Sequence, residues 1–451
     1  MSSGVGNPLG EWRSRMTFVL SLACATVGMG SVWRFSYLSG EYGGGPFVVA
    51  YVVFLLLLGV PLLIAELVLG RQGMGSVVES INRAVERSRL RPVWRVLPWF
   101  ICATGVLLLA LYVVVAGWAL VYAVAMYAGS FNAASMFNAG QYFQALVEDG
   151  DRMLLGQTVF LACAVAVVGA GVRRGIGFLA WLLVPTLLAG LVLLVQYSLA
   201  NGNASAAGKF LFSVQWLDFN SEAVLMALGQ AFFTLGVGVG TGISYGSYAP
   251  VRAPIGRSVL AVALFDTLVA IAMGLAIFPL VFASHLVPSM GPGLMFISLP
   301  YAFGNMLNGE VFGALFFALV VLVALGSAIA ILEPVTGAIK QRFGLRRVTS
   351  AVIVGAVVWL LAYAAAATLA PSSRGTAPDL FRHMDQLAGG VLLPLAALGT
   401  ALLVGWRLGR PLLRAQLYRE SPQFFSLWYF LLRYIAPLGI LLVMATALLT
   451  E

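Results

Sequence analysis

The chain has 451 residues, of which 61% are hydrophobic and only 10% are charged, and its mean hydropathy is +0.96. Soluble domains carry about 25% charged residues, so this composition excludes a soluble globular protein and indicates a membrane protein. The three cysteines lie in apolar runs without metal-ligand spacing, so we expect no disulfide framework and no cysteine-ligated metal.

Eleven apolar segments of about 20 residues follow one another along the chain, and each is long enough to cross a bilayer. We place them at residues 16–38, 46–69, 97–128, 154–171, 176–199, 221–249, 257–284, 311–340, 348–370, 381–407 and 425–449. An odd number of crossings puts the two termini on opposite sides of the membrane.

Basic residues are distributed unevenly over the two sides. Twenty of the 26 Lys and Arg residues fall on the side of the N-terminus, five fall on the other side, and Arg433 lies within the last segment. Because cytoplasmic loops are enriched in Lys and Arg, we expect a cytoplasmic N-terminus and an external C-terminus. The net charge of +9 then reflects topology, so we expect the lipid bilayer and not nucleic acid as a partner.

Two of the eleven segments are interrupted by glycine-rich stretches, at residues 27–30 and at residues 232–240. Inside a bilayer, an unwound turn leaves backbone N–H and C=O groups unpaired, which is tolerated only next to a cavity or a ligand. The interruptions occur in segments one and six, so each of two five-segment halves begins with a broken helix. This arrangement predicts a transporter of a small solute, with its central site at the breaks.

The backbone at the breaks favours a zwitterion next to a small hard cation. A half-helix that restarts after a break presents free N–H groups to an anion such as a carboxylate. The half-helix that ends presents carbonyls to a cation or an ammonium group, here from Cys24, Thr26 and Val27 and, at the second break, from Phe233 and Thr234. The alternative is that the glycines serve close helix packing, although they are clustered and do not recur every four residues.

At these residues the chain resembles the neurotransmitter:sodium symporter family. The strongest matching stretches are residues 27–35, 41–47, 66–71 and 229–235, with weaker support from 244–248 and 327–334. The resemblance implies an all-α polytopic membrane protein with an inverted five-plus-five helix repeat, broken helices 1 and 6, and eleven transmembrane helices. It further implies a secondary transporter, not an enzyme, in a bacterial cytoplasmic (inner) membrane.

The same resemblance divides a single transporter domain, residues 1–451, into two repeats. The first repeat covers about 12–199 and the second about 221–407, and an additional helix follows at about 425–449.

The resemblance also implies an α-amino acid substrate. Its carboxylate would meet the N–H groups of Met29 and Gly30 and the hydroxyl of Tyr112, and its ammonium group would meet the carbonyls of Thr26, Phe233 and Thr234. Relatives that take monoamines have an aspartate at the position of Gly28, so a glycine there favours an amino acid. The pocket for the substrate side chain would be formed by Leu108, Val239, Ala328 and Ile331, with Gly236 leaving room.

An outer gate is implied as well. Arg34 and Asp385 would form a direct or water-bridged ion pair, while Phe233 and Tyr112 close over the substrate. Arg34 could instead extend to the membrane interface. We expect Glu66 and Gln230 to hydrogen-bond to the unwound backbone.

At the inner gate the chain departs from the family. An arginine and its aspartate partner are replaced by Leu9 and Gln341. Closure then requires packing of Trp12, or ion pairs of Arg13 and Arg15 with acids such as Glu11 or Glu333.

Both implied sodium sites also depart from the family. Site 1 would comprise Thr26, Ser31, Thr234 and Asp266, with Ser31 and Asp266 in place of two asparagines. Site 2 would comprise Cys24, Val27, Val323, Gly326 and Ser327, and Gly326 lacks the hydroxyl of the family's threonine. We therefore expect site 2 to be weakened.

Asp266 is the residue on which function depends most. A carboxylate in the middle of a span is costly unless it is paired, and such a residue is functional by default. Asp266 could bind sodium, could replace the negative charge that chloride supplies in animal relatives, or could carry a proton. A purely structural role is the remaining alternative. We expect sodium as the coupling ion, no chloride requirement, and import of a neutral amino acid; the alternatives are a proton-coupled or ion-independent exchanger and a non-transporting sensor.

Overall fold

The computed structural model describes residues 9–12, 14–213, 220–287, 293–369 and 379–449, and these residues are helical with no strand among them. The first five spans are built from α1 (Arg15–Thr26), η1 (Gly30–Arg34), α2 (Phe35–Glu41), α3 (Gly45–Phe54), η2 (Leu55–Gly59), α4 (Val60–Gly73), η3 (Pro92–Val96), α6 (Leu97–Tyr127), α8 (Gly150–Ala170), η4 (Val172–Gly177) and α9 (Phe178–Asn201). The connecting helices are α5 (Val77–Arg87), α7 (Met136–Glu148) and α10 (Ala204–Phe212).

The remaining spans follow the same plan. They are built from α11 (Ser221–Thr234), α12 (Thr241–Tyr248), α13 (Ile255–Ala283), α15 (Gly309–Phe343), α16 (Arg347–Ala367), α17 (Leu380–Asp385), η8 (Gln386–Leu392), α18 (Leu393–Leu402), η9 (Leu403–Arg407), α20 (Pro422–Phe430), η10 (Leu431–Ile435) and α21 (Ala436–Leu449). Shorter connecting helices are η6 (Leu294–Ser298), α14 (Leu299–Gly304) and α19 (Arg410–Gln416).

The described residues contain nine helices that are long and apolar enough to cross a membrane, and a tenth if the bent pair formed by α1 and residues 30–41 counts as one span. The remaining predicted span, residues 221–249, corresponds to α11 and α12, which residues 235–240 separate. Every predicted segment therefore coincides with a helix or a broken pair. The repeat boundaries within the chain stay a prediction.

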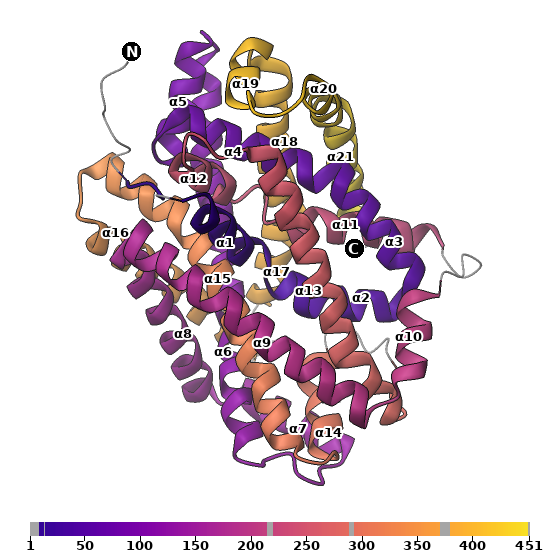
Figure 1. Cartoon of the computed structure of the whole chain (residues 1–451). Helices are drawn as coiled ribbons and strands as arrows, with labels where there is room; N and C mark the ends of the chain where they lie inside the picture. The colour runs from indigo at the N-terminus through magenta and orange to yellow at the C-terminus, as the bar shows by residue number, and fades with distance from the viewer. Residues whose placement is uncertain (1–8, 13, 214–219, 288–292, 370–378, 450–451) are drawn as a thin grey trace.

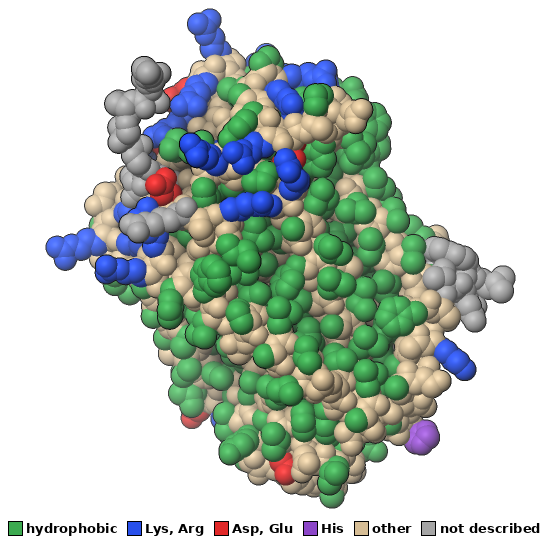
Figure 2. All heavy atoms as spheres, viewed as in Figure 1, with side chains coloured by type: hydrophobic (Ala, Val, Ile, Leu, Met, Phe, Trp, Pro, Cys, Tyr) green, Lys and Arg blue, Asp and Glu red, His purple; other side chains and the backbone are tan. Residues whose placement is uncertain are grey.

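The surface matches a protein surrounded by lipid. Hydrophobic side chains cover the middle of the face seen in Figure 2, whereas Lys and Arg side chains gather at the end where α5 and α19 lie in Figure 1. We call this end the arginine-rich end; it includes Arg83, Arg87, Arg342, Arg410, Arg414 and Arg419. The helix α7 lies at the opposite end of the molecule.

The first break lies where the sequence predicts it. Helix α1 ends at Thr26, Val27 is extended with ψ 105°, and the two halves of the span are bent by 57°. Half-helix α1 packs against α15, α9 and α13, and the restarted half, from Gly30 onward, packs against α13 and α11. The break is therefore enclosed by helices from both halves of the chain.

The second break requires glycine at three positions. Gly236, Gly238 and Gly240 have φ values of 60°, 90° and 79°, a backbone region that residues with a side chain rarely adopt. At Gly238 a Cβ atom would also lie 2.8 Å from the Leu393 carbonyl oxygen. The glycine cluster at this break is thus explained by backbone conformation, in addition to any role in binding.

Candidate substrate and ion site

Tyr112 of α6 lies directly against the first break. The Met29 N–H donates a hydrogen bond to the Tyr112 hydroxyl at 3.2 Å. A Cβ atom on Gly28 would lie 3.4 Å from the same hydroxyl and 2.7 Å from Ser327 Oγ. The space in front of Gly28 is therefore already filled, and an aspartate at this position would displace Ser327.

A hydrogen-bond network joins the two breaks through Gln230. Its side-chain amide donates to the Gly30 carbonyl at 2.8 Å and to Thr234 Oγ1 at 3.1 Å. On the other side, Glu66 accepts from the Gly238 N–H at 2.7 Å and from the Gly242 N–H at 3.0 Å. The expectation that Glu66 and Gln230 support the unwound backbone is confirmed.

One side chain of the expected apolar pocket, that of Ile331, lies beside Gly105 of α6. A Cβ atom on Gly105 would lie 3.5 Å from Ile331 Cγ2 and 3.6 Å from the Val239 carbonyl oxygen. Gly105 is three residues before Leu108 and seven before Tyr112, so the three lie on one face of α6. Nothing lies within 4 Å of a Cβ atom on Gly236, so open space remains there.

Gly105 was not among the predicted residues, although its helical spacing from Leu108 and Tyr112 is a signal that could have identified it. No contact in the structure tests the placement of Leu108 or Ala328 at the substrate. The carbonyl of Phe233, which we expected to be free for an ammonium group, accepts the Gly236 N–H at 3.2 Å.

The outer gate residues are close together but not directly paired. The Arg34 guanidinium lies 4.4 Å from the centroid of the Phe233 ring, and Asp385 is near enough to interact electrostatically with Arg34. Arg34 and Asp385 both belong to the described residues, and no ion pair within 4 Å joins their side chains. The direct ion pair is therefore absent from this conformation, and the water-bridged form stays a prediction.

Asp266 of α13 is fully buried, with 0% of its surface exposed. Its carboxylate accepts hydrogen bonds from Ser31 Oγ at 2.6 Å and from the Tyr51 hydroxyl at 3.1 Å. Both hydrogen-bond partners are neutral, and no basic side chain of the described residues lies within 4 Å of the Asp266 carboxylate. The structure thus brings together Ser31 and Asp266, and Gln230 connects Thr234 to the same break.

Tyr51 of α3 is a contact of this site that the sequence did not reveal. It is fully buried and packs edge-on against Phe35 at 5.2 Å between ring centroids. Its position in an apolar run made it indistinguishable from a core aromatic, since the Asp266 that it contacts is 215 residues away in sequence.

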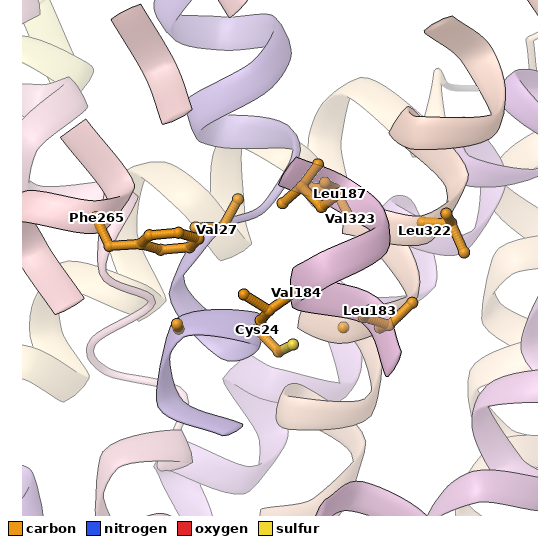
Figure 3. A pocket seen from close by; sticks show the side chains of 10 residues that line it. Cys24, Val27, Leu183, Val184, Leu187, Phe265, Leu322 and Val323 are labelled. Atoms are coloured by element: carbon orange, nitrogen blue, oxygen red, sulfur yellow. The ribbon is translucent and has the colours of Figure 1, made fainter. Parts of the chain in front are cut away.

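Four of the five predicted site 2 residues line one small cavity, which has room for about one water molecule. Figure 3 shows Cys24, Val27 and Val323 around it, together with Leu183, Val184, Leu187 and Phe265. Gly326 also lines it. The lining side chains are apolar, so polar groups for an ion must come from the backbone and from Ser327.

Ser327 and Gly326 shape that cavity from α15. The Ser327 hydroxyl lies 3.3 Å from the Ala25 carbonyl and 3.2 Å from the Val27 carbonyl. A Cβ atom on Gly326 would lie 2.6 Å from the Cys24 carbonyl oxygen. Gly326 therefore allows α15 to approach α1 more closely than a residue with a side chain could.

Trp12 packs against α12 at the arginine-rich end. Trp12 is buried, donates its backbone N–H to the Tyr248 carbonyl at 2.9 Å and packs edge-on against Tyr245 and Tyr248. The expected packing role of Trp12 is thereby confirmed. Gln341 accepts from the Ser76 N–H at 2.8 Å.

The ion pairs at this end involve neither of the arginines that we considered. Glu333 pairs with Arg347 and accepts from the Tyr248 hydroxyl at 2.6 Å. Glu11 lies 3.8 Å from Arg173. Arg15 forms no ion pair with described residues, and Arg13 lies outside them. Sequence reasoning missed Arg347 because it lies on the next helix, α16, which folds back along α15.

A membrane-spanning helical bundle with two broken helices that meet at its centre is typical of secondary transporters. The comparisons with known proteins agree. The chain matches the model of the Sodium:neurotransmitter symporter family over residues 9–139 and 131–450. The chain therefore belongs to this family, and it is a transporter and not an enzyme.

Individual relatives and one solved structure give the same result. The chain is 32% identical over 443 residues to an uncharacterized sodium-dependent transporter, YhdH, of Bacillus subtilis (strain 168), with 96% of each protein covered. It is 25% identical to the sodium-dependent serotonin transporter of Drosophila melanogaster, over 78% of this chain and 63% of that protein. The crystal structure of MhsT in complex with L-phenylalanine is 34% identical, with a TM-score of 0.87, and the match covers 97% of this chain and 99% of that one. The predicted fold class is thus confirmed.

Proposed function

We propose that the chain imports a neutral α-amino acid with a small or apolar side chain, together with sodium, by alternating access. The observation that carries this proposal is the buried Asp266 carboxylate, which has two neutral hydroxyls as hydrogen-bond partners. An unpaired charge in a membrane interior is strongly unfavourable. A sodium ion between Asp266, Ser31 and the breaks removes that cost and holds the substrate carboxylate next to it.

The substrate class is supported by Gly28 and by the pocket on α6. Ser327 Oγ fills the space that an acidic side chain at position 28 requires, so position 28 offers no carboxylate to a monoamine. The hydroxyl of Tyr112 and the N–H of Met29, which bond to each other in this conformation, are the partners for a substrate carboxylate. The Ile331 side chain, which lies beside Gly105, favours an apolar substrate side chain. The complex of MhsT with L-phenylalanine supports the same class.

The negative charge of Asp266 also supports transport without chloride. A carboxylate that is present permanently can balance sodium in the way that a bound anion does. Replacement of chloride by gluconate is expected to leave sodium-dependent binding unchanged.

The test is binding of radiolabelled neutral amino acids to purified protein, with sodium or choline, at pH 6 and pH 8. We expect sodium-dependent binding in the wild type and a sodium midpoint raised at least about tenfold in Asp266→Asn, which corresponds to about 1.4 kcal/mol. Asp149→Asn, an exposed carboxylate paired with Arg152, is the matched control and keeps the wild-type midpoint.

Two other results would contradict the proposal in different ways. Binding that ignores sodium but changes between the two pH values, and is lost in Asp266→Asn, identifies a proton-coupled carrier. Binding without any uptake into vesicles identifies a sensor. The cavity at site 2 is apolar, and Gly326 supplies no hydroxyl to an ion there. We therefore expect site 1 to be the one strong sodium site and the Hill coefficient for sodium to be close to one.

A further inference from the structure

Arg433 is a charged residue inside the last membrane span. It lies in η10, between the apolar helices α20 and α21. Within the described residues, no Asp or Glu lies within 4 Å of its guanidinium group, and its Nε atom is buried without a hydrogen-bond partner. Glu420, the acid nearest to it in sequence, pairs with Arg257 instead. The positive charge of Arg433 thus has no counter-charge within 4 Å among the described residues.

Aromatic rings hold Arg433 in place without neutralising it. Its guanidinium lies 4.4 Å from the Trp406 ring centroid, 5.6 Å from that of Tyr434 and 5.8 Å from that of Tyr429, and it donates to the Tyr429 hydroxyl at 3.2 Å. Cation–π contacts orient a guanidinium, but its remaining N–H groups stay available for an anion. Arg410 adds a second positive charge, 4.9 Å from the same Tyr429 ring.

The packing of two helices builds this cluster. A Cβ atom on Gly405 would lie 3.3 Å from Arg433 Cα, so glycine permits η9 to cross η10 at this point. The Trp406 indole N–H then donates to the Arg433 carbonyl at 2.9 Å. This tryptophan also packs edge-on against Tyr434. The cluster is therefore a defined structural site and not a set of independent surface residues.

The site opens toward lipid. Exposed apolar side chains follow one face of α20 and α21 at helical spacing, namely Leu427, Phe430, Tyr434, Leu438 and Leu441. Trp406 is 48% exposed. This span is also the least buried of the spans in the described residues. Acyl chains can lie along that face while a headgroup reaches Arg433 and Arg410, near α19 at the arginine-rich end (Figure 1).

We propose that Trp406, Tyr429, Tyr434, Arg410 and Arg433 bind the phosphodiester headgroup of an anionic phospholipid. Guanidinium groups form paired hydrogen bonds with phosphate oxygens, and basic pockets between membrane helices on the cytoplasmic side suit anionic headgroups. A lipid supplies the missing counter-charge and covers the apolar face at the same time, which a soluble anion does not.

The test compares retention of phosphatidylglycerol and phosphatidylcholine by the purified full-length protein, counted by native mass spectrometry. We expect wild type to retain phosphatidylglycerol preferentially and Arg433→Gln to lose about fivefold of that retention, the effect of one arginine near an anionic bilayer surface. Arg342→Gln, an exposed arginine at the same end, makes the same change in net charge and is expected to behave as wild type.

Three results would overturn the proposal. Equal losses in Arg433→Gln and Arg342→Gln mean that only net charge matters, and equal retention of the two lipids means that the headgroup is not recognised. Displacement of bound lipid by inorganic phosphate alone identifies a soluble anion as the ligand. If Arg433→Gln does not fold, Arg410→Gln tests the same site, and a wild-type result for that folded variant contradicts the proposal.

Discussion

The glycines at the first break differ in what surrounds them, and that difference determines which substitutions each position tolerates. A Cβ atom on Gly28 meets Ser327 Oγ at 2.7 Å, whereas one on Gly30 meets nothing within 4 Å. Gly326 faces the Cys24 carbonyl on the other side of the same region. A side chain at Gly28 or Gly326, where α1 and α15 meet, is therefore not accommodated. A side chain at Gly30, where the restarted half-helix begins, has room.

Substitution of Gly28 by alanine is expected to weaken substrate binding at least about tenfold. Overpacking a filled space costs about 1–3 kcal/mol, and here the displaced group is Ser327. Gly30→Ala adds the same methyl group to open space and is expected to cost less. Equilibrium binding of the two variants measures the difference; equal losses would show that the contact with Ser327 is not the cause.

The hydroxyl of Ser31 is expected to support sodium binding through Asp266. Hydrogen bonds to charged groups contribute about 1.5–3 kcal/mol, so Ser31→Ala is expected to raise the sodium midpoint by about tenfold or more. Ser36→Ala removes a buried hydroxyl one turn farther along the same span, where it donates to the Val32 carbonyl, and serves as the control. A shift of similar size in both variants would argue against a specific role of Ser31.

Elements are linked at two places by buried carboxylates. Glu66 of α4 accepts from the N–H groups of Gly238, in the middle of the second break, and of Gly242, in the first turn of α12. Glu333 of α15 binds Arg347 of α16 and Tyr248 of α12. Each carboxylate connects a broken helix to a continuous one. Buried hydrogen bonds therefore add to the helix packing that holds the broken helix in place.

Substitution of Glu66 is expected to lower the midpoint of thermal unfolding, by an amount that depends on the acceptors that remain. Glu66→Ala leaves two buried backbone N–H groups without an acceptor, at about 1–3 kcal/mol each. Glu66→Gln retains one acceptor oxygen. The midpoint should thus fall from wild type to Gln to Ala, and a Gln variant as unstable as Ala would show that charge and not hydrogen bonding matters.

Removal of Glu333 is expected to destabilise the closed arginine-rich end. Breaking a buried pair leaves an uncompensated charge and costs about 3–5 kcal/mol; the side chains of Arg347 and Glu333 are 13% and 0% exposed. The exposed pair of Arg95 and Glu86 provides the comparison, since such pairs contribute about 0–1 kcal/mol. The unfolding midpoint should drop in Glu333→Gln and barely change in Glu86→Gln.

For the molecule as a whole, the order of spans could be predicted because each membrane helix must satisfy its own backbone. Apolar length and glycine breaks therefore sufficed for the spans and their interruptions, whereas the inverted five-plus-five fold came from the family resemblance. The partners of Asp266 and Glu333 could not all be predicted, since Tyr51 and Arg347 become neighbours through packing of separate helices. Ordinary residue types at those positions carry no local signal of the contact.

The orientation of the molecule is testable with two cysteines. In a background with Cys24, Cys102 and Cys163 replaced by alanine, a membrane-impermeant maleimide should label Phe137→Cys in intact cells, because α7 lies at the end opposite the arginine-rich end. Arg342→Cys should be labelled only after permeabilisation. The reverse pattern would contradict the orientation inferred from the distribution of Arg and Lys.

The burial of Asp266 between two neutral hydroxyls determines which step of a one-sodium cycle responds to voltage. A bound sodium ion cancels the charge of the carboxylate and a zwitterion adds none, so the loaded site moves no net charge. If Asp266 stays ionised after sodium has left, the emptied site carries one negative charge, which an inside-negative potential drives outward at about 2.3 kcal/mol per 100 mV. In the proposed cycle, membrane potential would then accelerate the return of the empty carrier, whereas entry of the loaded carrier would move no net charge.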